Sequence, residues 1–162
     1  SASTRFDPIT RLSDTVHRTL ATPDDLDRLD TLVASHHAEA GIAQDASARR
    51  EALLALLEGA PHGAGYLIGP VRAPIGYVLL SFGWSVRQGG MTATLDELFI
   101  RPGVRNRGIG AEVLTSLPKA LKGAGLKVMH VETPRDQPRP RSLYQRMRFH
   151  PRDEVMILSR DV

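Results

Sequence analysis

The stretch of sequence that decides the fold reads Arg105-Asn106-Arg107-Gly108-Ile109-Gly110. It lies between a strand-like run over residues 93–100 and a helical pattern whose apolar positions repeat up to residue 121. The first turn of a helix has backbone N–H groups without internal partners, and the helix dipole adds partial positive charge there. Glycines in such a loop let a ligand approach the backbone closely. The arrangement therefore predicts a cradle for a pyrophosphate.

Two common nucleotide motifs fit this stretch less well. A P-loop requires Gly-Lys-Ser or Gly-Lys-Thr, and the chain contains neither. A dinucleotide fingerprint requires a third glycine, but Val113 stands at that position. That fingerprint also turns almost directly from strand to glycine, whereas residues 101–107 intervene here. Glu132, which ends the next expected strand and could bind a ribose, keeps an NAD site open as the weaker alternative.

Two motifs together resemble the GCN5-related N-acetyltransferase (GNAT) family. That family has a hydrophobic strand, x-Pro and then Arg/Gln-x-x-Gly-x-Gly/Ala opening a helix. Here the strand end is Leu98-Phe99-Ile100-Arg101-Pro102, and the loop residues are Arg105, Gly108 and Gly110. Further on, Ser142-Leu143-Tyr144-Gln145-Arg146-Met147-Arg148-Phe149 resembles the family's Ala-Leu-Tyr-x-x-x-Gly-Phe. The order and the separation of the two motifs also fit the family.

The resemblance covers nearly the whole chain and implies an α/β (α+β) fold. In this fold a mixed, mostly antiparallel sheet is splayed between its fourth and fifth strands and flanked by about four helices. The sequence patterns agree, and they predict strands over 15–20, 65–68, 75–82, 93–100, 126–132 and 155–158. They also predict helices starting at Pro23 and after Gly108, and over 47–58 and 141–147. Pro118 should kink or shorten the helix that follows the glycine loop.

The length of 162 residues predicts a single domain, over residues 14–162. Residues 1–13 form an N-terminal extension, whose start Ser1-Ala2-Ser3 is interpreted as a remnant of processing or cloning. No apolar run approaches the roughly 20 residues of a membrane span, and no signal-peptide core is present. A cytoplasmic protein is the resulting expectation.

The resemblance implies acetyl-CoA as cosubstrate and no metal. The pantetheine arm would pair with the end of the fourth strand, and the pyrophosphate would meet the N–H groups of residues 106–111. The coenzyme-binding residues implied in this way are Leu98, Phe99, Ile100, Arg105, Asn106, Arg107, Gly108, Ile109, Gly110, Ala111 and Gln137. Two of the positions depart from the family pattern. Gln137 stands where many members have an asparagine, and Arg148 replaces a glycine and would be strained at positive φ.

Acetyl transfer from a thioester to an amine requires a neutral amine and a proton for the departing thiolate. Tyr144 resembles the family's tyrosine that faces the coenzyme sulfur, and it is the expected proton donor. The candidate bases are Glu97 and Asp96, followed by Glu132. Adjacent strand residues point to opposite faces, so only one of Asp96 and Glu97 faces the cleft unless a bulge reorients them. For each carboxylate, an ordinary solvated or salt-bridged side chain is the alternative.

Charge is distributed unevenly along the chain. Residues 1–81 hold 7 Lys and Arg against 10 Asp and Glu, and residues 82–162 hold 14 against 8, which gives +3 in total. A basic half that carries both motifs suits a polyanionic coenzyme. Nucleic acid remains a minority alternative, because the chain is poor in aromatic residues and lacks the known binding signatures.

The expected function is direct transfer of an acetyl group from acetyl-CoA to a primary amine of a small molecule or peptide. The paired carboxylates favour a cationic amine. A non-catalytic acyl-CoA sensor of the same fold is the alternative. We expect neither a nucleic acid nor a membrane as a partner. A homodimer is one option for the assembly. The chain has no cysteine, which excludes a cysteine acyl-enzyme. His36 and His37 lie by the loop that often walls the acceptor pocket in this family, but such pairs more often form a solvated helix end.

Overall fold

The computed structural model describes residues 17–162. These residues form two compact units, of which the first ends at Glu132 and the second covers residues 133–162. The first unit contains β1 (Arg18–Leu20), the 3-10 turn η1 (Pro23–Asp25), α1 (Leu26–Ala40), α2 (Ala46–Leu57), β2 (Gly63–Ile68), β3 (Gly76–Ser85), β4 (Gly90–Ile100), the 3-10 turn η2 (Pro102–Val104), α3 (Ile109–Lys122) and β5 (Leu126–Val131). The second unit contains α4 (Pro138–Arg146).

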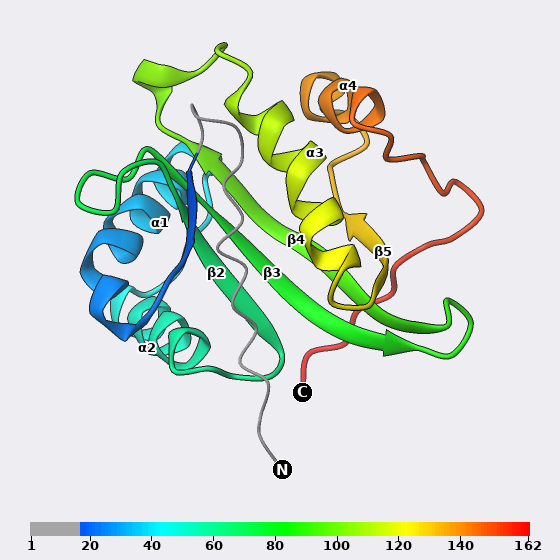
Figure 1. Ribbon diagram of the computed structural model, residues 1–162, viewed down its shortest axis with the longest axis horizontal. Helices are drawn as coiled ribbons and strands as arrows, with labels where there is room; N and C mark the ends of the chain where they lie inside the picture. Colours follow the sequence, from blue (N-terminus) through cyan, green and yellow to red (C-terminus); the bar gives the residue numbers. More distant parts are fainter. Residues whose placement is uncertain (1–16) are drawn as a thin grey trace. The chain divides into compact units, whose positions relative to one another are not determined.

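The sheet of the first unit has the order β1-β2-β3-β4-β5 (Figure 1). The first three pairings are antiparallel, whereas β4 and β5 run parallel. The expected mixed, mostly antiparallel sheet is therefore confirmed. The N-terminal extension proposed for residues 1–13 and the first two residues of the strand predicted over 15–20 lie outside the described residues.

Helices cover both faces of this sheet. On one face, α1 and α2 bury Leu29, Leu32 and Leu53 against Tyr77 and Phe99 of the strands. On the other side of the sheet, α3 lies along β4 and β5 and buries the apolar stripe that the sequence predicted. The site-bearing strand β4 therefore lies between two hydrophobic layers, which fixes its backbone.

The first helix begins as the sequence predicted. Thr22 precedes Pro23, and the backbone N–H of Thr22 donates to the Asp25 carboxylate over 2.9 Å, one half of a capping box. The opening turn is a 3-10 turn that continues into α1. A left-handed Gly41 ends α1, as is usual for a glycine at this position.

A β-bulge interrupts the pairing of β3 with β4. Leu79 pairs with Glu97, but Leu80 pairs with Leu95, so Asp96 is an extra residue without a partner on β3. Pairing of β4 with β5 extends only to Leu95 opposite Val131. From Asp96 to Ile100, β4 therefore continues without β5 beside it. This is the splay between the fourth and fifth strands that the family resemblance implied.

Helix α3 runs through Pro118 to Lys122, so of the two effects expected of Pro118, a kink or a shorter helix, the shortening does not occur. One expectation about secondary structure was wrong. The strand predicted over residues 155–158 does not form, because this segment has no strand partner within the described chain and Met156 and Leu158 are more than three-quarters exposed. An apolar run alone does not make a strand when no neighbouring strand pairs with its backbone N–H and C=O groups. Among the described helices, none has the length and apolar character that crossing a membrane requires.

The close approach of β3 and β4 at Gly76 generates a test of the fold. A Cβ at this position would overlap the Phe99 carbonyl oxygen, so we expect Gly76→Ala to destabilise the protein by on the order of 1–3 kcal/mol. In a chain of this size, each kcal/mol lowers the melting temperature by about 2–4 °C. Gly103→Ala is the matched control, because no atom lies within 4 Å of its added Cβ. Equal melting temperatures for the two variants would contradict the register of β3 and β4.

Candidate functional site

The bulge places both acidic residues of β4 on the same face of the sheet. Glu97 shares the face of Phe99, which packs towards α1, whereas Leu95 belongs to the opposite face. The extra residue shifts the alternation, so Asp96 also points towards the face that α1 covers. The Asp96 carboxylate accepts a hydrogen bond from the Ser81 hydroxyl on that face. The sequence analysis expected both carboxylates to face the same way only if a bulge reorients them, and this bulge is present.

One oxygen of Glu97 is held by two other elements. Its Oε1 accepts a hydrogen bond from the Tyr77 hydroxyl on β3 over 2.8 Å and lies 2.9 Å from Nε2 of His37 on α1. Burial, followed by the charge of Glu97, raises the pKa of Tyr77, so its hydroxyl keeps the proton that it donates. No hydrogen bond or ion pair of the other oxygen, Oε2, is present among the described residues. Glu97 is thus fixed in orientation and has one oxygen free for a ligand.

The other two predicted carboxylates lie within electrostatic reach of this group. Burial raises the pKa of Asp96, and the negative charges of Glu97 and Glu132 raise it further. The hydrogen bond from Ser81 lowers this pKa but does not cancel the rise. No cation is paired with Asp96 within the described chain. Three carboxylates from the ends of β4 and β5 therefore share one negative region, which would attract a cation.

Histidines of α1 complete this cluster, although the sequence favoured a solvated helix end for the pair. His37 is buried, with 8% of its surface exposed, and the solvated helix end expected for the pair does not hold for this residue. The sequence pattern does indicate that His37 is buried, because Leu29, Val33 and His37 follow one another at four-residue spacing on the buried face of α1. Residues 17–162 contain no group of three or more ligands placed to hold a metal ion.

The loop between β4 and α3 carries a row of free backbone donors. Within α3 the first backbone bond runs from Glu112 N–H to the carbonyl of Gly108. No hydrogen bond within the described chain uses the N–H groups of residues 106–111. Asn106 and Gly108 have φ of 63° and 76°, the left-handed region that turns peptide N–H groups towards a common side. The loop thus has the properties of an anion site at a helix N-terminus.

Arg105 is bonded within the protein. Its guanidinium forms a two-pronged pair with Glu39, in which NH1 lies 2.7 Å from Oε1 and NH2 lies 2.9 Å from Oε2. Its Nε donates to the Ile100 carbonyl over 2.8 Å, and its charge lies over the Phe99 ring at 5.4 Å. These contacts tie the start of the loop to the end of α1. Arg107, by contrast, is exposed and has no side-chain partner within the described chain.

The second unit carries the remaining predicted residues. Tyr144 lies on α4 and packs edge-on against Phe149, with ring centres 5.8 Å apart. Burial raises the pKa of Tyr144, so the phenol remains protonated and able to donate. Gln137 is the N-cap residue of α4. Arg148 has φ of 70°, so the positive φ expected of a replaced glycine is present at the end of this helix.

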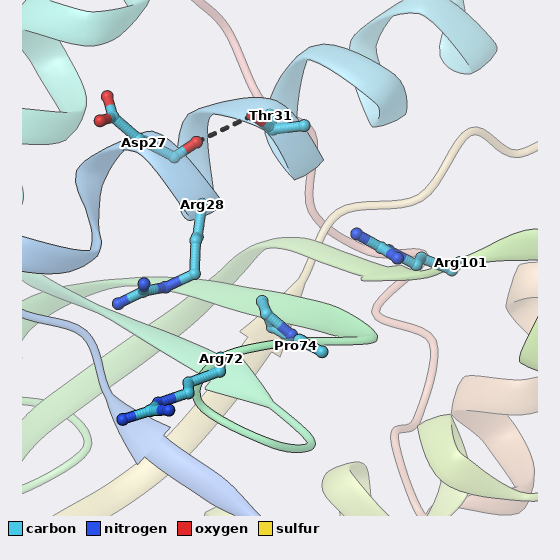
Figure 2. A pocket seen from close by; sticks show the side chains of 7 residues that line it. Asp27, Arg28, Thr31, Arg72, Pro74 and Arg101 are labelled. Carbon is cyan, nitrogen blue, oxygen red and sulfur yellow. Dashed lines mark hydrogen bonds between the residues drawn. The ribbon is translucent and has the colours of Figure 1, made fainter.

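A surface pocket lies elsewhere on the first unit. It has a volume of about 360 Å³ and is formed by the first half of α1, the turn between β2 and β3, and Arg101 (Figure 2). Arg28, Arg72 and Arg101 give it a positive lining. None of the predicted site residues contributes to it. The chemistry of the carboxylates and of the glycine loop is therefore separate from this pocket.

The chain is similar to one protein family and to several solved structures. The model of the acetyltransferase (GNAT) family matches residues 28–149. The integron cassette protein HFX_CASS3, from the mobile metagenome of Cole Harbour Salt Marsh, is 29% identical, with a TM-score of 0.78 over 94% of this chain and 93% of that chain. A possible acetyltransferase from Clostridium difficile 630 is 14% identical, with a TM-score of 0.82 over 92% of this chain and 99% of that chain.

A third similar structure is AAC(6')-Iy in complex with the bisubstrate analog CoA-S-monomethyl-acetylneamine. It is 16% identical, with a TM-score of 0.70 over 91% of this chain and 99% of that chain. Among curated proteins, none matches this sequence. Because the matched residues 28–149 make up most of its length, the chain belongs to the acetyltransferase (GNAT) family.

Proposed function

We propose that this protein transfers an acetyl group from acetyl-CoA directly to a primary amine that carries positive charge. One observation supports this proposal above all: the same segment of β4 has an edge without a neighbouring strand and carries a carboxylate that is held in place. Beyond Leu95, β4 has no β5 beside it, and Glu97 lies on this same segment. A donor lying along that edge and an amine at Glu97 would meet at the same strand.

For the donor, the free N–H groups of residues 106–111 would receive the pyrophosphate, and residues 98–100 would line the pantetheine arm. Arg105 would act mainly by fixing the loop, because its guanidinium is already bonded to Glu39 and Ile100. Exposed Arg107 would add positive charge. AAC(6')-Iy, which shares this fold, was solved with a ligand that contains coenzyme A, and this supports the assignment.

For the acceptor, the negative region formed by Asp96, Glu97 and Glu132 favours a cationic amine. Glu97 would take the proton that the amine loses, through its free oxygen Oε2. Tyr144 would give a proton to the departing thiolate. The class of amine that these groups suit includes polyamines, lysine side chains and aminoglycosides.

Turnover itself is the main test. With acetyl-CoA and a panel of amines, we expect release of free thiol with cationic primary amines. Glu97→Gln and Tyr144→Phe should each lower kcat by about 10²–10⁴, the usual contribution of general acid–base catalysis. Glu51→Gln, which removes an exposed carboxylate from α2, is the control. Coenzyme binding without turnover on any amine would favour the acyl-CoA sensor instead.

The loop generates a second prediction. Gly108→Asp introduces a carboxylate among the free N–H groups, so acetyl-CoA binding should weaken by about a hundredfold or more, because like charges at an anion site cost several kcal/mol. Gly125→Asp is the matched control at the other end of α3. Both glycines have positive φ (76° and 103°) and open space around the added Cβ. Isothermal titration calorimetry measures both affinities, and equal values would refute the cradle.

Asp96 generates a prediction about pH. Its pKa is raised in the folded protein, so the folded state binds more protons than the unfolded chain between the ordinary value of 3.8 and the raised one. Stability therefore falls as pH rises through this window and stays lower at neutral pH. We expect Asp96→Asn to be more resistant to urea than the wild type at pH 7, with the difference vanishing below pH 3.8. A variant that is less stable at pH 7 would show that Asp96 is not destabilised by its surroundings.

A further inference from the structure

His36 lies beside Glu97, and both side chains are partly exposed. Its Nε2 is 3.8 Å from Oε1 of Glu97, and 23% of its side chain is exposed. The ring packs against Phe99, with centroids 5.3 Å apart, and edge-on towards Tyr77 at 6.2 Å. These ring contacts limit the positions of the imidazole. His36 is thus ordered next to the carboxylate and in contact with water.

Each turnover of the proposed reaction leaves a proton on Glu97, and this proton must depart before the next cycle. Tyr77 offers no exit, because its hydroxyl already donates to Oε1 and its raised pKa keeps it protonated. With Glu97 ionised, Nε2 of His37 is also a donor to Oε1. The other nitrogen of His37, Nδ1, is buried and has no partner within the described chain. The Glu97 side chain is itself 21% exposed, and an amine bound at Oε2 would cover part of that exposed surface.

We propose that His36 relays to solvent the proton that Glu97 takes from the acceptor amine. The inference rests on the proposed function, and it adds a residue that neither the sequence motifs nor the family match assigns. His36 acts through Glu97 and touches neither the amine nor the thioester. His37 and Tyr77 are positioning residues, because they hold the carboxylate by one oxygen while the other receives the proton.

The amine N–H bond breaks and an O–H bond forms on Glu97 as the amine nitrogen bonds to the thioester carbonyl carbon. The C–S bond then breaks, and the thiolate takes a proton from Tyr144, which regains one from water. The O–H bond of Glu97 then breaks, an N–H bond forms at Nε2 of His36, and the imidazolium gives its Nδ1 proton to water. Nε2 of His36 lies 3.8 Å from the other oxygen of Glu97, Oε1, so one bridging water would carry the proton from Oε2 to Nε2. Glu97 ends as a carboxylate and His36 as a neutral ring.

The surroundings keep His36 neutral and able to accept. Burial lowers its pKa below 6.5, and the charges of His37 and Arg105 lower it further, although Glu97 and Glu39 act in the opposite direction. A neutral ring also does not repel a cationic amine. The titratable and charged groups that face it come from its own helix, from β3, from β4 and from the following loop: His37, Glu39, Tyr77, Glu97 and Arg105.

Kinetics with a turned-over amine test the relay. We expect His36→Gln to lower kcat by about tenfold to a hundredfold, the lower part of the range for proton-transfer groups, with little change in KM. In the wild type, kcat should fall as pH drops below the pKa of His36. The pH profile of His36→Gln should lack this fall. For His36→Ala, added imidazole should restore part of kcat. His62→Gln, an exposed histidine before β2, is the control and should behave as wild type.

A measurement without substrate keeps the test independent of folding in the His36 variants. Because the charge of Glu97 raises the pKa of His36, Glu97→Gln should lower that pKa further in an NMR titration. An unchanged His36 titration would overturn the relay. Where the wild type acetylates its amine, two kinetic results would also overturn the relay. One is a His36→Gln variant with the kcat of the wild type and the same fall of kcat at low pH. The other is a lowered kcat in His36→Ala that added imidazole does not restore. Absence of turnover on any amine would instead refute the proposed function, and the relay with it.

Discussion

One extra residue in β4 is the constraint on which the site depends. Asp96 has no partner on β3, and this single insertion has two effects. It brings Asp96 and Glu97 to the same face, and it lies where pairing between β4 and β5 stops. A regular strand would have separated the two carboxylates by the thickness of the sheet. The chemical cluster and the opening beside it thus have a common origin in the backbone.

Glu97 connects the elements around this opening. It is held by Tyr77 from the neighbouring strand and by His37 from the helix that covers the sheet. A carboxylate in such surroundings is costly unless its oxygens are hydrogen-bonded, and here only one of them is. Asp96 is in a less favourable state, because it has two negative neighbours and no cation within the described chain. Uncompensated charge of this kind is typical of sites whose partner is a ligand.

The sequence predicted most of this architecture and part of the site. Helix starts such as Thr22-Pro23, the apolar stripe of α3 and the glycine loop depend on local patterns, and local patterns are visible in one sequence. The prediction of a strand over 155–158 was wrong because a strand also needs a neighbouring strand, and a local pattern does not show whether a distant part of the chain supplies one. From the sequence, a bulge at Asp96 could be given only as the condition for both carboxylates to face one way. Whether it forms depends on the register of β4 with β3. His37 was assigned to a solvated helix end because a histidine was not counted in the apolar repeat of α1.

The pair between Arg105 and Glu39 has a mechanical consequence. Glu39 lies within one turn of His36 on α1, and Arg105 opens the loop that carries the free N–H groups. The two ends of the site are therefore joined by one helical turn and one two-pronged ion pair, whose side chains are partly exposed. Any movement of the loop that breaks or tightens this pair also pulls on the end of α1. The end of α1 that this pair holds is the same segment that carries His36 and His37.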